Sequence, residues 1–386
     1  MVVKTPPMGW NSWNTFGPNI NEALIRETAD TMVDSGLAAA GYNYLVIDDC
    51  WSEKVRDGQG RLVASAEKFP NGMKAVSDYV HSKGLKFGMY SCAGIFTCAR
   101  YPSSYGYEFI DAETFASWGV DFLKYDYCNK PAGIPGHLLY KRMGTALANC
   151  GRDILFSACS WGADETHKWI KSTGAHMWRS TGDITDNWES IKNLTNRQIE
   201  LQPYNGNGCF NDMDMLVVGM HGKGNVALGG CTDEEYRTHF TIWAFFNSPL
   251  MIGCDIRSMS DETKAILMDK DIIAVNQDPA GRQPYQVLAH PDYPVWAKQM
   301  DNGDIVLAYF NLGEHNFNQF VTWADIGIER SSGVKLEVTD LWSKQTLGTF
   351  DTGIEFGAVV PHGCRILRCR VVRGWVRRLR PRADRR

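Results

Sequence analysis

The sequence has no stretch of about 18 consecutive apolar residues, which is the length that a membrane-spanning helix requires. Residues 1–7 also lack the apolar core of a secretory signal. We therefore expect no membrane partner and a cytoplasmic location, unless a signal has been removed. Internal repeats and low-complexity segments are absent too, and the apolar content of 44% is ordinary for a globular protein.

The cysteines follow no short, regular spacing. There are 11 of them, an odd number, so they indicate neither a zinc site nor a disulfide framework. Cys150 and Cys254 stand among apolar residues, where we expect them to be small core side chains.

A surplus of positive charge is also missing. The net charge is −4, and residues 373–386 alone contribute seven Arg against one Asp, so the rest of the chain is more acidic still. An acidic body argues against nucleic acid as a partner. The Arg-rich tail by itself would suit nucleic acid, but it follows the last predicted strand and has no helical apolar pattern. We interpret residues 372–386 as an appendage outside the fold that is either disordered or an artificial addition to the chain.

The pattern of the remaining chain is an alternation of short apolar strands with amphipathic helices. Eight such units predict an α/β fold, a (β/α)8 TIM barrel over residues 1–290. Residues 291–371 contain only short alternating strands separated by turns, which predicts a C-terminal antiparallel β-sandwich. The expected barrel strands are 8–13, 44–47, 85–90, 121–128, 153–157, 177–181, 210–216 and 249–254, and the expected helices are 24–37, 69–81, 113–118, 138–150, 164–172, 188–201, 233–246 and 261–276.

Charged residues follow several of these strands. In the fourth strand Lys124 and Asp126 are two residues apart and share one face of an extended segment. A structural ion pair is the simpler explanation for one such pair. Other strands end the same way, with Asp48 and Asp49 or with Arg179, as is typical of the catalytic face of a barrel.

Two carboxylates at different strand ends, surrounded by aromatic residues, suit the cleavage of a glycosidic bond. Asp126 fits the nucleophile, because Lys124 beside it is expected to lower its pKa and keep it ionised. Asp183 fits the general acid, a role that needs a raised pKa. From spacing alone, Asp183 is equally acceptable as the N-cap of the helix that begins near Trp188.

Five motifs in this order make the chain similar to glycoside hydrolase family 27, which contains the α-galactosidases and α-N-acetylgalactosaminidases. They are Met8-Gly9-Trp10-Asn11-Ser12-Trp13, Ile47-Asp48-Asp49-Cys50-Trp51, Leu123-Lys124-Tyr125-Asp126, Trp178-Arg179 with Asp183-Ile184, and Asn211-Asp212-Met213-Asp214-Met215. The resemblance covers residues 5 to about 370. It implies a barrel with a C-terminal β-sandwich and a retaining double displacement that uses no metal or other cofactor.

The resemblance also assigns roles to individual residues. Asp126 corresponds to the nucleophile and Asp183 to the acid/base, while Asp48 and Asp49 correspond to the residues that bind the axial 4-OH and the 6-OH of the sugar. Lys124 is expected near the 3- and 4-OH and Arg179 near the 2-position. Helix capping by Asp48 and Asp49, core packing of Trp13 and plain packing of Met215 are the alternatives. The further pocket residues that it implies are Trp13, Tyr90, Cys98, Trp161, Asp214 and Met215.

The cysteines beside the site bear on this resemblance. Cys98 and Cys128 resemble a disulfide pair of the family, although a cytoplasmic chain would keep them reduced. Cys50 resembles one cysteine of a second disulfide bond of the family. The partner cysteine would fall near Pro18, where this chain has no Cys, so we expect this bond to be absent.

The substrate is less closely defined. Ser160 and Ala163 resemble the small residues that leave room for a 2-acetamido group in the N-acetylgalactosaminidases. We nevertheless expect first an exo-acting enzyme that releases terminal α-linked galactose. The alternatives are an α-N-acetylgalactosaminidase, more remotely a β-L-arabinopyranosidase, and a non-catalytic carbohydrate-binding protein. A homo-oligomer is compatible with the sequence.

Overall fold

The computed structural model describes residues 3–373 and divides after Gln283 into two compact units. The sequence placed this boundary after residue 290. The difference arises from β9 (Tyr285–Leu288), a half-exposed strand at the edge of its sheet whose pattern gave no clear strand signal. Of the predicted tail, residues 372 and 373 belong to the last strand of the second unit, so the appendage was placed two residues too early, and residues 374–386 lie outside the described part. No helix among the described residues is long and apolar enough to cross a membrane.

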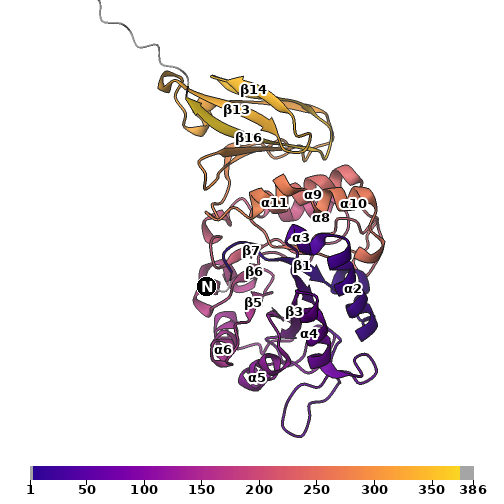
Figure 1. Cartoon of the computed structure of the whole chain (residues 1–386). Helices are drawn as coiled ribbons and strands as arrows, with labels where there is room; N and C mark the ends of the chain where they lie inside the picture. The colour runs from indigo at the N-terminus through magenta and orange to yellow at the C-terminus, as the bar shows by residue number, and fades with distance from the viewer. Residues whose placement is uncertain (1–2, 374–386) are drawn as a thin grey trace, which may run out of the picture. The chain divides into compact units, whose positions relative to one another are not determined.

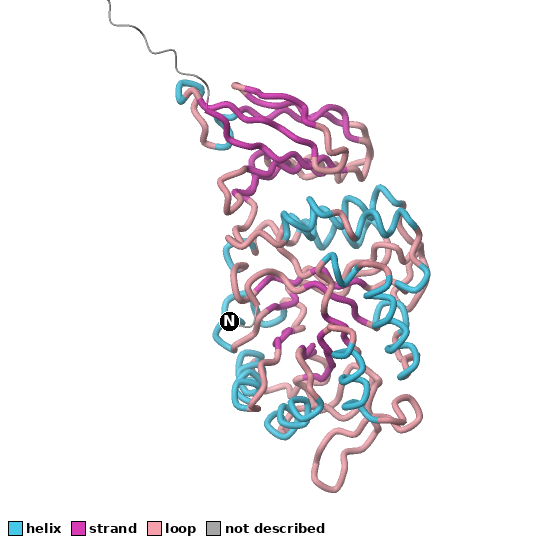
Figure 2. Tube along the Cα trace, in the orientation of Figure 1, coloured by secondary structure: helices cyan, strands magenta, loops and turns pink. Residues whose placement is uncertain are grey.

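The first unit is a parallel α/β barrel (Figures 1 and 2). Its eight strands are hydrogen-bonded in the order β7-β6-β5-β4-β3-β2-β1-β8. A parallel bridge between Leu216, just after β7, and Ile252 in β8 closes the ring. The strands are β1 (Met8–Asn11), β2 (Tyr44–Val46), β3 (Lys86–Cys92), β4 (Phe122–Asp126), β5 (Leu155–Ala158), β6 (Met177–Arg179), β7 (Phe210–Asp212) and β8 (Leu250–Ile252).

Helices follow the strands of this unit, and in Figure 2 they lie around the magenta strands of the barrel. Several begin at clear capping residues: the Asn21 side chain accepts from the N–H of Leu24, and Thr232 with Glu235 forms a capping box. The helices of this unit are α1 (Trp13–Phe16), α2 (Glu22–Asp34), α3 (Leu37–Ala40), α4 (Gly72–Ser82), α5 (Glu108–Trp118), α6 (Gly136–Asn149), α7 (Thr166–Trp169), α8 (Trp188–Asn196), α9 (Asp233–Phe245), α10 (Asp261–Leu267) and α11 (Lys270–Asn276), with 3₁₀ turns η1 (Ala163–Glu165), η2 (Ile170–Thr173), η3 (Gln202–Tyr204) and η4 (Ile256–Ser258).

Two predicted helices are broken in the structure. The segment 164–172 consists of η1, α7 and η2 rather than one helix, because Asp164 and Glu165 adopt positive φ angles of 53° and 54°. The segment 261–276 splits in two, since the Asp269 side chain caps a new helix by accepting from the N–H groups of Asp271 and Ile272.

Apolar side chains fill the barrel interior, so its centre is a packed core. They come from the barrel strands and from the segments beside them: Val3, Tyr44, Val46, Phe122, Leu155, Met177, Phe210, Met215 and Met251. The polar residues predicted at strand ends therefore gather at the carboxyl-terminal end of this core.

The second unit consists of two antiparallel sheets. One has the order β14-β13-β16-β11-β10-β9 and the other pairs β12 with β15. Its core contains Trp323, Tyr309 and Phe356 among aliphatic residues from both sheets. Its remaining elements are β10 (Val295–Gln299), β11 (Ile305–Phe310), β12 (Phe317–Thr322), β13 (Val334–Asp340), β14 (Thr346–Phe350), β15 (Gly353–Val359), β16 (Cys364–Arg373), η5 (Trp323–Ile326) and η6 (Arg330–Ser332).

Candidate active site

A cavity of 410 Å³ opens where the barrel strands end. Most of its lining residues lie at or just beyond the carboxyl ends of β2 to β7, the usual place of the active site in this fold. It is lined by Trp13, Asn14, Asp48, Asp49, Tyr90, Cys98, Lys124, Asp126, Cys128, Cys159, Trp161, Arg179, Gly182, Asp183, Ile184, Asp214, Met215 and Val226.

This lining includes every predicted site residue except Ser160. Six residues of the lining were not among the predicted pocket residues, although Cys128 was expected in a disulfide beside the site: Asn14, Cys128, Cys159, Gly182, Ile184 and Val226. The position of Cys159 directly after β5 is the signal that could have indicated it, since residues at the carboxyl ends of barrel strands form the site.

Ser160 does not line the cavity. It is fully buried, and its hydroxyl forms a hydrogen bond of 2.7 Å with Thr166 Oγ1. Ala163 begins the turn η1 and does not line the cavity either. The prediction that these two small residues open space beside the 2-position of the sugar is therefore wrong for this geometry.

Asp48 and Asp49 form one wall of the cavity. Lys124 Nζ lies 2.8 Å from Asp48 Oδ2, and Asn11 donates to the same oxygen at 2.8 Å. Burial raises the pKa of Asp49, although the N–H groups of Ala99 and Cys50 donate to it. Because Lys124 pairs directly with Asp48, the strand-end charges form a network across β2 and β4.

Asp126, at the end of β4, is only 7% exposed. The Tyr90 hydroxyl donates to its Oδ2 at 3.1 Å and the N–H of Tyr127 to its Oδ1 at 2.9 Å. Burial raises its pKa to about 6, against the opposing influence of Lys124. The expectation of a lowered pKa is therefore wrong, because desolvation outweighs the neighbouring cation. At neutral pH the group is still mostly ionised.

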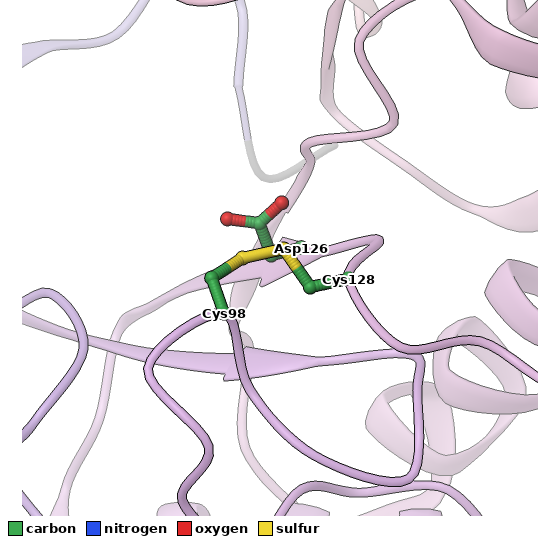
Figure 3. A group of neighbouring side chains, drawn as sticks. All are labelled: Cys98, Asp126 and Cys128. Atoms are coloured by element: carbon green, nitrogen blue, oxygen red, sulfur yellow. A yellow bond between two sulfur atoms is a disulfide. The ribbon is translucent and has the colours of Figure 1, made fainter.

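A disulfide bond between Cys98 and Cys128 lies beside the Asp126 carboxylate (Figure 3). It joins the loop after β3 to the loop after β4, and the Tyr90 hydroxyl lies 3.3 Å from Cys98 Sγ. The two sulfur atoms and Asp126 are close enough to hold a metal ion. A disulfide, however, offers no thiolate ligand, so this group does not fit a metal site. Cys50 is a free thiol, which confirms the prediction that its family bond is absent.

Asp183 lies at the cavity mouth, with its side chain 77% exposed. The N-cap of α8 is Asn187, so Asp183 has no capping role. The buried Arg179 donates to Asp183 at 2.8 Å and contacts Asp214 at 3.0 Å. Desolvation works to raise the pKa of Asp183, but the charge and hydrogen bond of Arg179 lower it below its usual value. This is the opposite of the raised pKa that a general acid needs.

Trp161 is held in an uncommon conformation, with φ of 58°. The following residue, Gly162, donates its N–H to the carbonyl of Arg179 at 3.1 Å. A Cβ on Gly162 would lie 2.2 Å from the carbonyl oxygen of Ser180, so only glycine fits. This close approach fixes the backbone next to Trp161, which lines the cavity. Residues in uncommon backbone conformations often cluster at functional sites.

Comparison with known proteins agrees with both units. The family model of alpha galactosidase A matches residues 5–278, and that of the alpha galactosidase C-terminal beta sandwich domain matches residues 290–369. The α-galactosidase of Cyamopsis tetragonoloba is 46% identical over 366 residues, which cover 94% of this chain and 85% of the relative.

Solved structures agree as well. That of α-galactosidase I from Mortierella vinacea has a TM-score of 0.89 at 37% identity and covers 95% of this chain and 97% of its own. The structure of the Saccharomyces cerevisiae α-galactosidase with raffinose has a TM-score of 0.86 at 31% identity. The match covers 96% of this chain and 98% of the yeast chain.

Proposed function

The chain belongs to glycoside hydrolase family 27, and we propose that it is an exo-acting α-galactosidase that releases terminal α-linked galactose with retention of configuration. The observation that carries this proposal is the meeting of Asp126 and Asp183 in one cavity of 410 Å³. Asp126 lies deep and Asp183 lies at the mouth, an arrangement that suits a single terminal sugar held inside with its leaving group outside.

In the first step, an Asp126 oxygen attacks the anomeric carbon while the bond to the glycosidic oxygen breaks. Asp183 gives its proton to the departing oxygen, so that the leaving group departs as an alcohol. In the second step, Asp183 takes a proton from water, which displaces Asp126 and releases galactose. Two inversions at the same carbon give net retention.

The rest of the cavity provides groups for holding galactose. The carboxylates of Asp48 and Asp49 can accept hydrogen bonds from the hydroxyl groups of the sugar. The ionised Lys124 can donate hydrogen bonds to the oxygens of the same hydroxyl groups. Trp13 and Trp161 offer apolar faces for the C–H side of the ring. A sugar whose hydroxyls do not reach Asp48 and Asp49 forgoes these charge-assisted hydrogen bonds and binds more weakly.

Galactose is the preferred sugar over N-acetylgalactosamine in this proposal. The two small residues that favoured the acetamido group do not line the cavity, while Cys159 and Arg179 do. The Arg179 guanidinium lies 3.8 Å from Cys159 Sγ, so the larger of these two lining side chains is held against the other at the cavity wall. The non-catalytic alternative loses its basis, because both carboxylates are present and face the same cavity.

The test compares the p-nitrophenyl α-galactoside, α-N-acetylgalactosaminide and β-L-arabinopyranoside as substrates, and follows the anomeric form of the first-formed sugar by NMR. We expect kcat/KM to be highest for the galactoside and α-galactose to appear first. Asp126→Asn should reduce kcat by at least about a thousandfold, whereas the exposed control Asp351→Asn should keep the parent rate. First-formed β-galactose would refute retention, and near-parent turnover by Asp126→Asn would remove Asp126 from the nucleophile's role.

A further inference from the structure

The disulfide bond beside Asp126 takes no part in the proposed mechanism. Cys98 is exposed and Cys128 is half-buried, so a reductant can reach the bond from solvent. In Figure 3 both sulfur atoms lie next to the Asp126 carboxylate. The two sulfurs and a carboxylate oxygen all lie within 4.8 Å of one another, and residues 3–373 contain no second group of three potential metal ligands at this spacing.

Reduction changes what this group offers to a metal ion. A dithiol reductant gives two electrons and two protons to the bond, so the S–S bond breaks, Cys98 and Cys128 become thiols, and the reductant closes its own disulfide. Each thiol releases its proton to solvent when a metal binds, since the thiolate is the ligand. Two thiolates and one carboxylate supply three protein ligands, and water takes the fourth position of a tetrahedral zinc site.

The spacing of the three groups suits Zn²⁺. With Zn–S bonds of about 2.3 Å and a Zn–O bond of about 2.0 Å, the ligand atoms of a tetrahedral site lie roughly 3.5 to 3.8 Å apart. The Cα atoms of Cys98 and Cys128 are 5.1 Å apart, so rotation of the two side chains opens the sulfurs to this distance once the bond is broken. The Asp126 carboxylate already lies within reach of both sulfurs.

The backbone around the two cysteines is also held by contacts that do not involve sulfur. The N–H of Ile95 donates to the Asn129 carbonyl at 3.1 Å, and the Asn129 side chain donates to the Thr97 carbonyl at 2.9 Å. The N–H of Ala99 donates to the Asp49 carboxylate at 2.9 Å. Reduction removes the covalent connection between the two loops and leaves these hydrogen bonds, so the two thiols remain neighbours.

The surroundings of the group favour a cation. The cavity lining contains five aspartates against one lysine and one arginine. The Tyr90 hydroxyl contacts two of the three groups, since it donates to Asp126 Oδ2 at 3.1 Å and lies 3.3 Å from Cys98 Sγ. A hydrogen-bonded neighbour of this kind orients metal ligands.

We infer that reduction of the bond between Cys98 and Cys128 creates a zinc site whose third ligand is Asp126. Zinc in this site occupies the carboxylate that attacks the anomeric carbon, so the metal inhibits the reduced protein and spares the oxidised one. Zinc binding is independent of the proposed function, whereas the inhibition rests on it, because the metal blocks turnover only if Asp126 is the nucleophile.

The binding test compares the oxidised parent with parent that has been reduced by a dithiol and then separated from it in the absence of oxygen. One equivalent of Co²⁺ should give a thiolate-to-cobalt charge-transfer band in the reduced parent and not in the oxidised parent, and Zn²⁺ should abolish the band by displacing Co²⁺. The matched control is Cys98→Ser/Cys128→Ser, which lacks both the bond and the thiolates and should give no band. In reduced Asp126→Asn the affinity for Zn²⁺ should fall by at least about tenfold, because an amide is a weaker ligand than a carboxylate.

Three results of the binding test overturn the site. They are the absence of the band in the reduced parent, an equal band in the serine double variant, and an unchanged Zn²⁺ affinity in Asp126→Asn.

The activity test measures hydrolysis of p-nitrophenyl α-galactoside with one equivalent of Zn²⁺, each protein being compared with itself in the presence of a chelator. The reduced parent should lose at least about tenfold in kcat/KM, whereas the oxidised parent and the serine double variant should show no zinc-dependent loss. Full activity with zinc bound, or equal inhibition of the serine double variant, contradicts the inference. If zinc binds as expected and no form of the protein hydrolyses the galactoside, the proposed function fails and the inhibition with it, while the zinc site stands.

Discussion

At the scale of single residues, Asp126 shows how burial sets the charge state of a catalytic group. Its pKa of about 6, above the usual 3.8, means that the folded protein binds more protons than the unfolded chain between about pH 4 and 6. Stability contributed by this group therefore falls as the pH rises through that window. The ionised carboxylate that the reaction needs costs folding free energy at neutral pH.

Asp126→Asn should remove that cost. At pH 7.5 we expect the variant to be more stable than the parent by up to roughly 3 kcal/mol, and the difference should fade towards pH 4. Urea unfolding at both pH values measures it. A variant that is less stable than the parent at pH 7.5 would contradict the conclusion that burial, rather than Lys124, dominates the pKa of Asp126.

Ser160 provides a second prediction at this scale. Because its hydroxyl bonds Thr166 away from the cavity, Ser160→Ala should cost about 1 kcal/mol of stability and leave the preference for galactose over N-acetylgalactosamine unchanged. Cys159→Ala, which changes a lining residue, is the comparison variant and should shift that preference. Thermal unfolding measures the stability, and kcat/KM on the two p-nitrophenyl glycosides measures the sugar preference. A changed sugar preference in Ser160→Ala would show that Ser160 does contribute to the sugar site.

At the scale of elements, the sequence predicted the barrel strands because buried parallel strands are short apolar runs that polar residues terminate. It could not predict the break at Asp164, because Asp164 and Glu165 adopt positive φ although neither is a glycine. Nor could the sequence predict that Val226 lines the cavity, because the glycine-rich loop around it has no helix or strand periodicity that would indicate its course. The sequence also could not predict the direction of the pKa shifts at Asp126 and Asp183. The shift at Asp126 depends on how deeply it is buried, and the shift at Asp183 depends on its ion pair with Arg179.

The disulfide leads to the prediction at this scale. Cys98 and Cys128 are 30 residues apart, so removing the bond should destabilise the barrel by about 3 kcal/mol through the entropy of the unfolded chain. It should also lower kcat, because the loops beside Tyr90 and Asp126 lose their connection. Unfolding and rates of the Cys98→Ala/Cys128→Ala double variant test this, with the free thiol variant Cys150→Ala as control. Parent stability and parent kcat in the double variant would contradict it.

At the scale of the whole molecule, the two carboxylates together set the pH range of activity. The working form needs Asp126 ionised and Asp183 protonated, yet Arg179 lowers the pKa of Asp183 while burial raises that of Asp126. The competent form is then most abundant between the two pKa values. We expect kcat/KM on p-nitrophenyl α-galactoside to follow a bell that declines above about pH 6. A plateau from pH 6 to 8 would show that substrate-free Asp183 holds its proton more tightly than Arg179 allows.

The proposed mechanism depends most on a covalent bond between galactose and Asp126, and trapping that intermediate tests it directly. The protein is incubated with a fluorinated galactosyl fluoride whose intermediate hydrolyses slowly, then digested and examined by mass spectrometry. The mechanism predicts one added fluorogalactosyl group, on the peptide that contains Asp126, and none in Asp126→Asn. A label on another residue, or none in a protein that hydrolyses the galactoside, would contradict it.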